Sequence, residues 1–147
     1  MINNNFEKKL KGKEFVFTAE TSPPDSTVRS EITDRVLCLK DLADAINVTD
    51  GASAKSHLSS LVVSSIIKDI EIEPILQLTT RDRNRIAIQS DLLGAWTLNI
   101  QNILCIYGDQ VETGDQPETK EVRDLDTLGV INTCLLYTSD AADDNTC

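Results

Sequence analysis

The sequence predicts an α/β fold in which parallel strands alternate with helices. Four short runs, at residues 14–19, 45–49, 74–78 and 100–107, have the β-branched and aliphatic composition of strands. The segments between them repeat apolar side chains at helical spacing. This alternation is typical of parallel strands joined by right-handed crossovers, a fold that binds its ligands where the strands end.

The first strand and helix are separated by a double proline. The run Glu-Phe-Val-Phe-Thr-Ala at residues 14–19 is the strand. Pro23 and Pro24 have no amide hydrogen for sheet pairing, so the chain must turn there. Asp25 or Ser26 can cap the helix that follows. The apolar residues of that helix recur at steps of four, three and four: Ile32, Val36, Leu39 and Ala43.

The second unit begins with a short strand at residues 45–49, and Asp50 and Gly51 make the turn after it. A helix is predicted over residues 54–69. The apolar side chains along one side of this helix are Leu58, Leu61, Val62 and Ile66. Residues 74–78 then form the third strand.

The third helix is predicted over residues 84–98, where Gly94 and Ala95 would let it pack closely on the sheet. Residues 100–107 form the fourth strand. A polar loop then leads to a fourth helix, which opens at residues 124–128.

Composition excludes several classes of function. The 147 residues carry a net charge of −10, and such a chain repels nucleic acid unless it has a basic patch. No apolar run approaches about 18 residues and no signal sequence is visible, so we expect a cytoplasmic protein without membrane contact. Neither a G-x-G-x-x-G motif nor a P-loop occurs, so a cofactor would be held by loops at the strand ends. The one basic cluster is expected to be a solvated N-terminal helix or arm; it consists of Lys8, Lys9, Lys11 and Lys13.

The cysteines and the single histidine indicate no metal site, since no pair of cysteines has metal-ligand or redox spacing. Cys38, on a predicted helix, and Cys105, in a predicted strand, are expected to be small buried apolar residues. His57 is expected to be a solvated residue of the second helix, so we predict no catalytic dyad through it.

Two carboxylates stand near the predicted strand ends. Glu20 follows the first strand beside Pro23 and Pro24, where it could act as a general acid; a surface turn glutamate is the alternative. Asp109 follows Gly108, which has no side chain and lets a planar ligand approach the backbone; a turn aspartate is the alternative.

Three charged residues, Arg81, Asp82 and Arg83, follow the third strand. Their guanidinium groups have the geometry to bind a diphosphate. They could equally pair with the carboxylates beside them, and the sequence leaves both interpretations open.

Three stretches carry a family resemblance: Glu20-x-x-Pro23-Pro24, Arg81-Asp82-Arg83-Asn84, and Gly108-Asp109 followed by Gly114-Asp115-Gln116-Pro117. Together they resemble the methylenetetrahydrofolate reductase family over roughly residues 14–128. The resemblance implies a (β/α)8 TIM barrel, truncated here to about its first four β/α units. Residues 1–13 would be an N-terminal arm, and residues 14–133 the N-terminal half of a flavin-dependent barrel.

The resemblance also implies an activity, the reduction of 5,10-methylenetetrahydrofolate to 5-methyltetrahydrofolate with NAD(P)H. FAD is the implied cofactor, with FMN as the alternative. Glu20 would protonate the folate N10, and Asp109 would stabilise a cationic iminium beside the flavin. The implied cofactor-binding residues are Thr49, Gln77, Thr79, Arg81, Tyr107, Gly108 and Asp109. No metal is implied, and the full-length form could be a homo-oligomer.

The chain departs from the family pattern in several places. Thr21 and Ser22 replace aromatic residues, Gln77 stands where the family often has histidine, and Asp50 stands where familiar bacterial enzymes have tyrosine. Tyr107 replaces an arginine. These changes leave the flavin and the electron donor open. A non-catalytic module that binds a pterin or a corrinoid protein is the alternative function, because a fold does not determine function.

The C-terminal residues do not fit the rest of the chain. From Cys134 the sequence reads Cys-Leu-Leu-Tyr-Thr-Ser-Asp-Ala-Ala-Asp-Asp, which resembles the translation of a sequencing adapter. We expect residues 134–147 to be a non-native tail; a genuine acidic C-terminus is the alternative. If the tail is non-native, the natural protein continues beyond about residue 133. Four strands with an open edge on each side are expected to be inactive alone and prone to aggregate.

Overall fold

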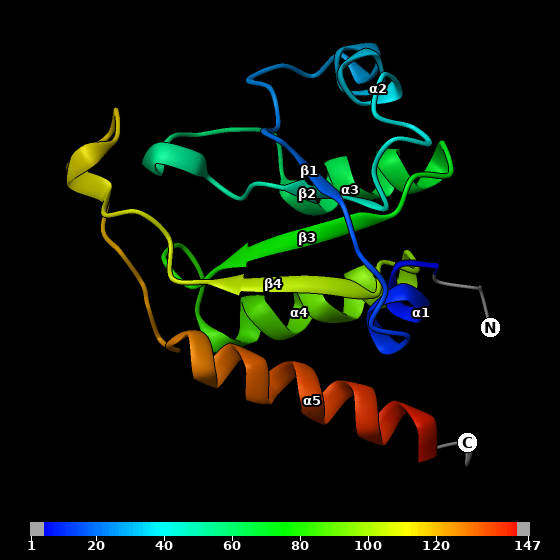
Figure 1. Cartoon of the computed structure of the whole chain (residues 1–147). Coiled ribbons are helices and arrows are strands. Elements are labelled where there is room, and N and C mark those ends of the chain that lie inside the picture. The colour runs from blue at the N-terminus through cyan, green and yellow to red at the C-terminus, as the bar shows by residue number, and fades with distance from the viewer. Residues whose placement is uncertain (1–4, 144–147) are drawn as a thin grey trace.

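The fold is built on one sheet of four parallel strands (Figure 1). The computed structural model describes residues 5–143. Its strands lie in sequence order across the sheet and are β1 (Thr18–Thr21), β2 (Ala45–Val48), β3 (Pro74–Thr79) and β4 (Asn102–Ile106). The predicted α/β fold with parallel strands is confirmed. Four strands in this order are compatible with part of a β/α barrel.

A helix follows each strand. These helices are α2 (Arg29–Leu37), α3 (Ser60–Asp69), α4 (Arg85–Thr97) and α5 (Thr127–Asp143), and α1 (Asn5–Lys11) precedes the sheet. Two short 3-10 helices, η1 (Ala52–Ala54) and η2 (Val111–Thr113), lie in the loops after β2 and β4. Within residues 5–143, none of the helices is both long and apolar enough to cross a membrane.

One face of the sheet is buried beneath the helices. Ile46 and Val48 on β2, with Leu76 and Leu78 on β3, are at most 1% exposed. They occupy every second position of their strands, because side chains alternate between the two faces of a sheet. Over β2, the helices α2 and α3 complete an aliphatic cluster with Ile32, Val36, Val63, Ile66 and Ile67.

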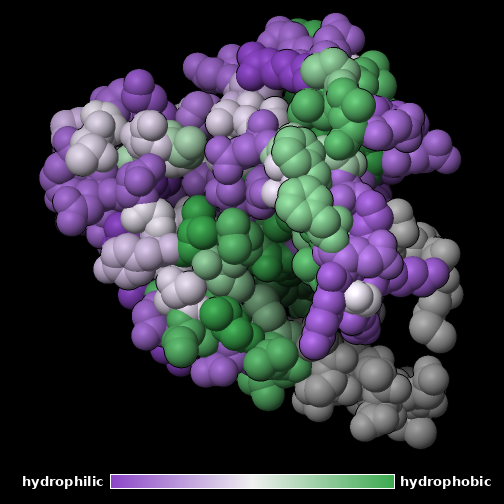
Figure 2. Space-filling model, in the orientation of Figure 1, coloured by the Kyte–Doolittle hydropathy of each residue, from purple (hydrophilic) through white to green (hydrophobic). Residues whose placement is uncertain are grey.

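The opposite face of the sheet is partly open. No helix covers it in the view of Figure 1, and Figure 2 shows apolar side chains around a hollow over β3 and β4. Ile75, Leu104 and Ile106 alternate with the core positions, and Leu104 is 43% exposed. Phe15 and Phe17, just before β1, are 86% and 57% exposed. In a closed barrel the face without helices would be the interior.

The first strand lies later in the chain than predicted, at Thr18–Thr21 instead of residues 14–19. Before it, the backbone N–H of Phe17 donates to Asp44 Oδ2 at 3.0 Å, and the carbonyl of Phe17 accepts from the Asp44 amide at 2.7 Å. Regular pairing with β2 starts only at the next residue. Glu20 therefore lies inside β1, and not after it.

Helix α2 is shorter than predicted and ends at Leu37. Residues 38–42 form turns, and Asp41 has a φ of 66°, a left-handed conformation that ends a helix. Leu39 packs against the core from this turn, which is why it fits the helical pattern. Cys38 is exposed on the same turn, so its predicted burial is wrong.

Helix α3 begins at Ser60 instead of at residue 54. Left-handed conformations at Gly51 and Ser53, with φ of 58° and 57°, keep the preceding segment irregular. His57 consequently lies in a loop and not on a helix. It is half-buried, and its Nε2 lies 3.3 Å from the carbonyl of Ala52.

Helix α5 packs against β4 and α4. Val130 is fully buried there, and Cys105 Sγ on β4 lies 4.0 Å from Cys134 Sγ on α5. Cys105 is half-buried, and not fully buried as predicted. The helix passes through residue 134, where we predict that a non-native tail begins.

A salt bridge ties the start of α4 to the loop before α5. Asp124 Oδ2 accepts from the backbone N–H and Nε of Arg85, at 3.0 and 2.8 Å. The bond from the Arg85 side chain contributes most, and together with the backbone bond it lowers the pKa of Asp124 from 3.8 to about 2. The stabilisation is fully present above pH 3.8 and is lost as the pH falls through about 2.

We expect the substitution Arg85→Gln to return the pKa of Asp124 most of the way to 3.8. The reason is that the glutamine has no charge with which to hold the carboxylate. An NMR titration of the carboxyl carbons measures this directly. Arg29→Gln is the control, since Arg29 pairs with Asp69 elsewhere, and an equal shift in both variants would contradict the assignment.

Candidate active site

A cavity of about 390 Å³ lies at the carboxyl ends of the strands. This is where parallel β/α folds bind ligands, and the volume falls in the range of roughly 300–1,000 Å³ found for small-molecule sites. The cavity is lined by Glu20, Thr49, Asp50, Ala52, Gln77, Ile106, Gly108 and Asp109. Five of the eight site residues that the sequence suggests meet here: Glu20, Thr49, Gln77, Gly108 and Asp109.

Glu20 and Gln77 contact each other on the open face of the sheet. Gln77 Nε2 donates to Glu20 Oε2 at 3.3 Å, so the amide holds one carboxylate oxygen. Among the described residues, no donor reaches Glu20 Oε1, and Glu20 is exposed. This oxygen is available to a ligand. Thr49 Oγ1 donates to Ser22 Oγ at 3.1 Å at the same rim.

Asp109 lies at the end of β4, across the cavity opening. Its Oδ2 accepts from the backbone N–H of Ser53 at 2.8 Å, which joins the loops after β2 and β4. Gly108 turns the chain just before it, with a φ of 85°. Thr79 Oγ1 donates to the carbonyl of Tyr107 at 3.2 Å and so holds this turn against β3.

The other three residues, Thr79, Arg81 and Tyr107, do not line this cavity. Thr79 is fully buried and Arg81 is 3% exposed. Arg81 Nε and Nη2 each donate to Asp82 at 2.7 Å, and Nη1 donates to the carbonyl of Gly51 at 3.2 Å. The hydrogen bond with Asp82 raises the pKa of Arg81. The sequence left two interpretations open, binding of a diphosphate and pairing with the neighbouring carboxylates. In the structure, Arg81 pairs with Asp82.

Tyr107 is exposed at the surface and is held by Arg123. The guanidinium carbon of Arg123 lies 3.7 Å from the centre of the Tyr107 ring, and its Nη1 donates to the Tyr107 carbonyl at 2.7 Å. Arg123 also pairs with Glu121 and lowers the pKa of that carboxyl. These contacts fasten the long loop after β4 back onto the strand end.

A second cavity of about 240 Å³ lies between the loops after β2, β3 and β4. It is lined by Ala54, Lys55, Ser56, Arg81, Asp82, Val111, Gln116 and Thr119. Lys55 supplies a positive charge there, whereas Arg81 is paired with Asp82, and Gln116 comes from the Gly-Asp-Gln-Pro stretch. Gly114 of that stretch packs tightly, because a Cβ on it would lie 2.1 Å from the carbonyl oxygen of Ala54.

Sequence reasoning missed the position of Asp50, which looks like an ordinary residue of an Asp-Gly turn. In the structure it is 9% exposed, lines the first cavity and forms a salt bridge with Arg83 of 2.6 Å. Arg83 pairs in addition with Asp91 on α4 at 2.8 Å. One sequence signal could have revealed this pair. Asp50 follows β2 and Arg83 follows β3, and these strands are neighbours with opposite charges beyond their ends.

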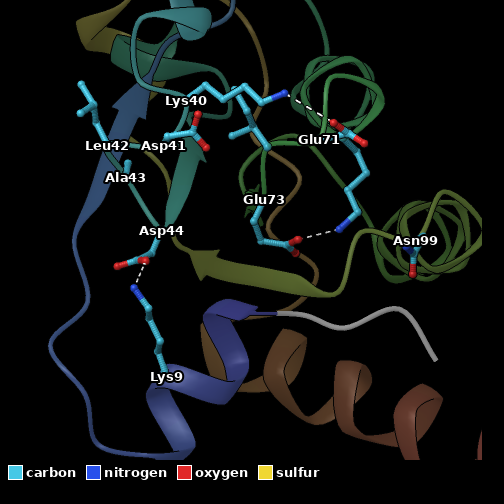
Figure 3. A pocket seen from close by; sticks show the side chains of 11 residues that line it. Lys9, Lys40, Asp41, Leu42, Ala43, Asp44, Glu71, Glu73 and Asn99 are labelled. Carbon is cyan, nitrogen blue, oxygen red and sulfur yellow. Dashed lines mark hydrogen bonds and ion pairs between the residues drawn. The ribbon is translucent and has the colours of Figure 1, made fainter.

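A larger cavity lies at the opposite, amino-terminal end of the strands (Figure 3). It has a volume of about 850 Å³, but most of its charged groups are engaged within the protein. Lys68 pairs with Glu73 at 2.6 Å, Lys9 pairs with Asp44, and Lys40 donates to the carbonyl of Ile70 at 2.9 Å. This end of a β/α fold serves stability, so we place the active site at the other end.

Comparison with known proteins identifies the family of the chain. The family model described as methylenetetrahydrofolate reductase matches residues 5–134, which is most of the chain. A search of curated proteins gives no significant match. Among residues 6–136, whose side chains the structure describes, no three histidine, cysteine or acidic side chains are grouped as a metal ion would require. The match and the strand order together show that the chain belongs to the methylenetetrahydrofolate reductase family.

Proposed function

We propose that this chain carries the flavin side of an oxidoreductase that reduces 5,10-methylenetetrahydrofolate to 5-methyltetrahydrofolate with NAD(P)H. One observation carries the proposal. Glu20, Gln77 and Asp109, which come from three different strands, surround a single cavity in a chain of this family. The two residues proposed for catalysis each have a carboxylate at that cavity.

The donor set of the cavity fits a flavin ring and a pterin. Gln77 can donate to or accept from a ring edge, and Thr49 can accept a hydrogen bond through its hydroxyl. Gly108 also lines this cavity. A bound flavin would accept a hydride from NAD(P)H and deliver it to the one-carbon group.

The proposed roles of the acids are those that the family resemblance implies, and their contacts leave room for them. Glu20 would deliver a proton to the folate through Oε1, while Gln77 anchors Oε2. Asp109 would lie near the opening, where its carboxylate favours a cationic iminium on the substrate. The protein thus supplies a proton on one side and negative charge on the other.

We place the phosphates of the cofactor at the second cavity. Lys55 lies beside it, next to the polar loop that contains Gln116, whereas Arg81 and Asp82 in its wall are paired with each other. A cofactor with its ring in the first cavity could extend its phosphates toward Lys55. We propose FAD, and FMN is the alternative because one phosphate needs the same kind of contact.

A flavin titration tests the proposal. The 147-residue chain should quench the fluorescence of added FAD or FMN, because the ring leaves water for the cavity. We expect no turnover with NAD(P)H and methylenetetrahydrofolate, since β1 and β4 have no neighbouring strand on their outer sides among residues 5–143. Turnover would overturn that expectation.

A failure of the titration would point to the other function. If neither flavin binds but methyltetrahydrofolate does, the flavin assignment is wrong and the pterin- or corrinoid-protein-binding module takes its place. Glu20→Gln is the informative variant, because it keeps the contact with Gln77 but removes the acid. Its flavin affinity should stay within about threefold of the original.

A further inference from the structure

We propose that Asp50 and Arg83 are positioning residues, which hold the strand ends so that the residues lining the candidate active site keep their places. The inference rests on the proposed function, because that function makes the cavity an active site. The contacts themselves can be tested without a ligand. Asp50 is the third carboxylate at the cavity, beside Glu20 and Asp109.

Asp50 differs from the other two because its hydrogen-bonding capacity is used up inside the protein. Its Oδ2 accepts from the backbone N–H of Thr79 at 2.9 Å and from Arg83 Nη1 at 2.6 Å. Its Oδ1 accepts from Ser60 Oγ at 3.1 Å and from Arg83 Nη2 at 3.3 Å. A carboxylate offers about four acceptor sites, so none is left for a ligand.

These bonds join elements that lie far apart in the sequence. Asp50 follows β2, Thr79 ends β3, and Ser60 is the first residue of α3. Ser60 Oγ also lies 3.2 Å from the carbonyl of Gln77, one of the cavity residues, so its single proton is shared between that oxygen and Asp50. The network therefore holds β2, β3 and α3 together at the cavity wall.

Two routes lead from the network to Asp109. Thr79 donates through its Oγ1 to the carbonyl of Tyr107, just before the turn that carries Asp109. On the other side, the chain runs from Asp50 to Ser53, whose amide donates to Asp109 Oδ2. Loosening Asp50 should loosen both supports of Asp109.

Arg83 is the partner that makes a buried charge tolerable. Its side chain is 18% exposed and lies between Asp50 and Asp91, and it also donates to the carbonyl of Thr79 at 3.3 Å. A buried carboxylate without a partner is strongly unfavourable. Arg83 does not line the cavity, and Asp50 has no acceptor site left for a ligand, so both act through Thr79, Ser53 and Asp109.

The test compares amide hydrogen exchange by NMR in Asp50→Asn, Arg83→Gln and Arg83→Lys. In Asp50→Asn, the new NH2 faces a nitrogen of Arg83 or the amide of Thr79, so the bidentate contact cannot form. We expect the Ser53 amide to exchange about tenfold faster in Asp50→Asn and Arg83→Gln, because its bond to Asp109 opens more often. The Ile67 amide in the core of α3 should stay within about twofold.

Arg85→Gln is the matched control, since Arg85 lies two residues from Arg83 but pairs with Asp124 outside the cavity. It should leave the Ser53 amide unchanged. Arg83→Lys keeps the charge and should give an intermediate effect even if Arg83→Gln does not fold. An unchanged Ser53 amide in Asp50→Asn, or equal acceleration at Ser53 and Ile67, would overturn the proposal.

A flavin titration of the same variants separates this inference from the proposed function. If the original chain binds FAD, Asp50→Asn should weaken binding about tenfold and Arg85→Gln should not. Equal affinities would overturn the positioning role. If the original chain binds no flavin, the proposed function fails, and the Ser53 amide alone decides the inference.

Discussion

Replacing Gly108 with alanine is expected to lower the free energy of unfolding by about 3 kcal/mol and to abolish flavin binding. Gly108 has a φ of 85°, which alanine adopts only with strain. A Cβ at this position would lie 2.2 Å from Thr79 Oγ1 and 3.2 Å from Arg81 Cβ. Thr79 is fully buried and bonded to Tyr107, so it cannot move aside. The strand end and the cavity must shift instead.

Urea unfolding followed by circular dichroism measures the first effect, and flavin fluorescence measures the second. Gly94→Ala is the control, because a Cβ on Gly94 in α4 would meet only Leu61 Cδ2, at 3.4 Å. That change should alter stability by less than about 1 kcal/mol. Adding Thr79→Ala to Gly108→Ala removes the closest atom and should recover part of the loss. Equal stability of Gly108→Ala and Gly94→Ala would contradict this account.

Truncating Ile67 to alanine is expected to lower the free energy of unfolding by about 3 to 4 kcal/mol. Ile67 lies in the last turn of α3, is fully buried and belongs to the cluster that joins α2 and α3 to β2. The substitution removes apolar contacts and leaves a cavity that its neighbours cannot fill. Because single domains are stable by only about 5–15 kcal/mol, this change removes a large part of the total.

Val62→Ala on the same helix is the control. Val62 is 45% exposed, so most of its surface meets water in the folded chain as well. We expect a loss of less than about 1 kcal/mol. Urea unfolding of both variants gives the comparison. If Ile67→Ala and Val62→Ala lower the free energy of unfolding equally, α3 does not pack as described.

Local sequence patterns predicted the strands with buried faces best. The runs that became β2 and β3 are short and aliphatic, and both lie within one residue of the predicted bounds. Helix α4 was also predicted closely, because Asn84 caps it through a bond to the amide of Ala87. In these cases the residues that set the boundary lie in the segment itself.

The errors share a cause, which is that a contact from elsewhere set the boundary. The first strand starts late because Asp44 bonds Phe17 outside the regular pairing. The second helix ends early at Leu37, before a turn that contains the left-handed residue Asp41, and Leu39 reaches the core from that turn. A periodic pattern records which side chains are buried, but it does not record whether a helix carries them there.

By itself, the sequence determined the order of strands and helices, the family, and the placement of polar residues where strands end. These follow from residue types and their spacing along the chain. Only the tertiary structure decided that Glu20, Gln77 and Asp109 share one cavity, that Arg81 is paired with Asp82, and that Asp50 is saturated by internal bonds. The physical reason is that a side chain's role depends on which of its hydrogen-bonding sites other segments occupy. Those segments are brought together by the packing of the sheet.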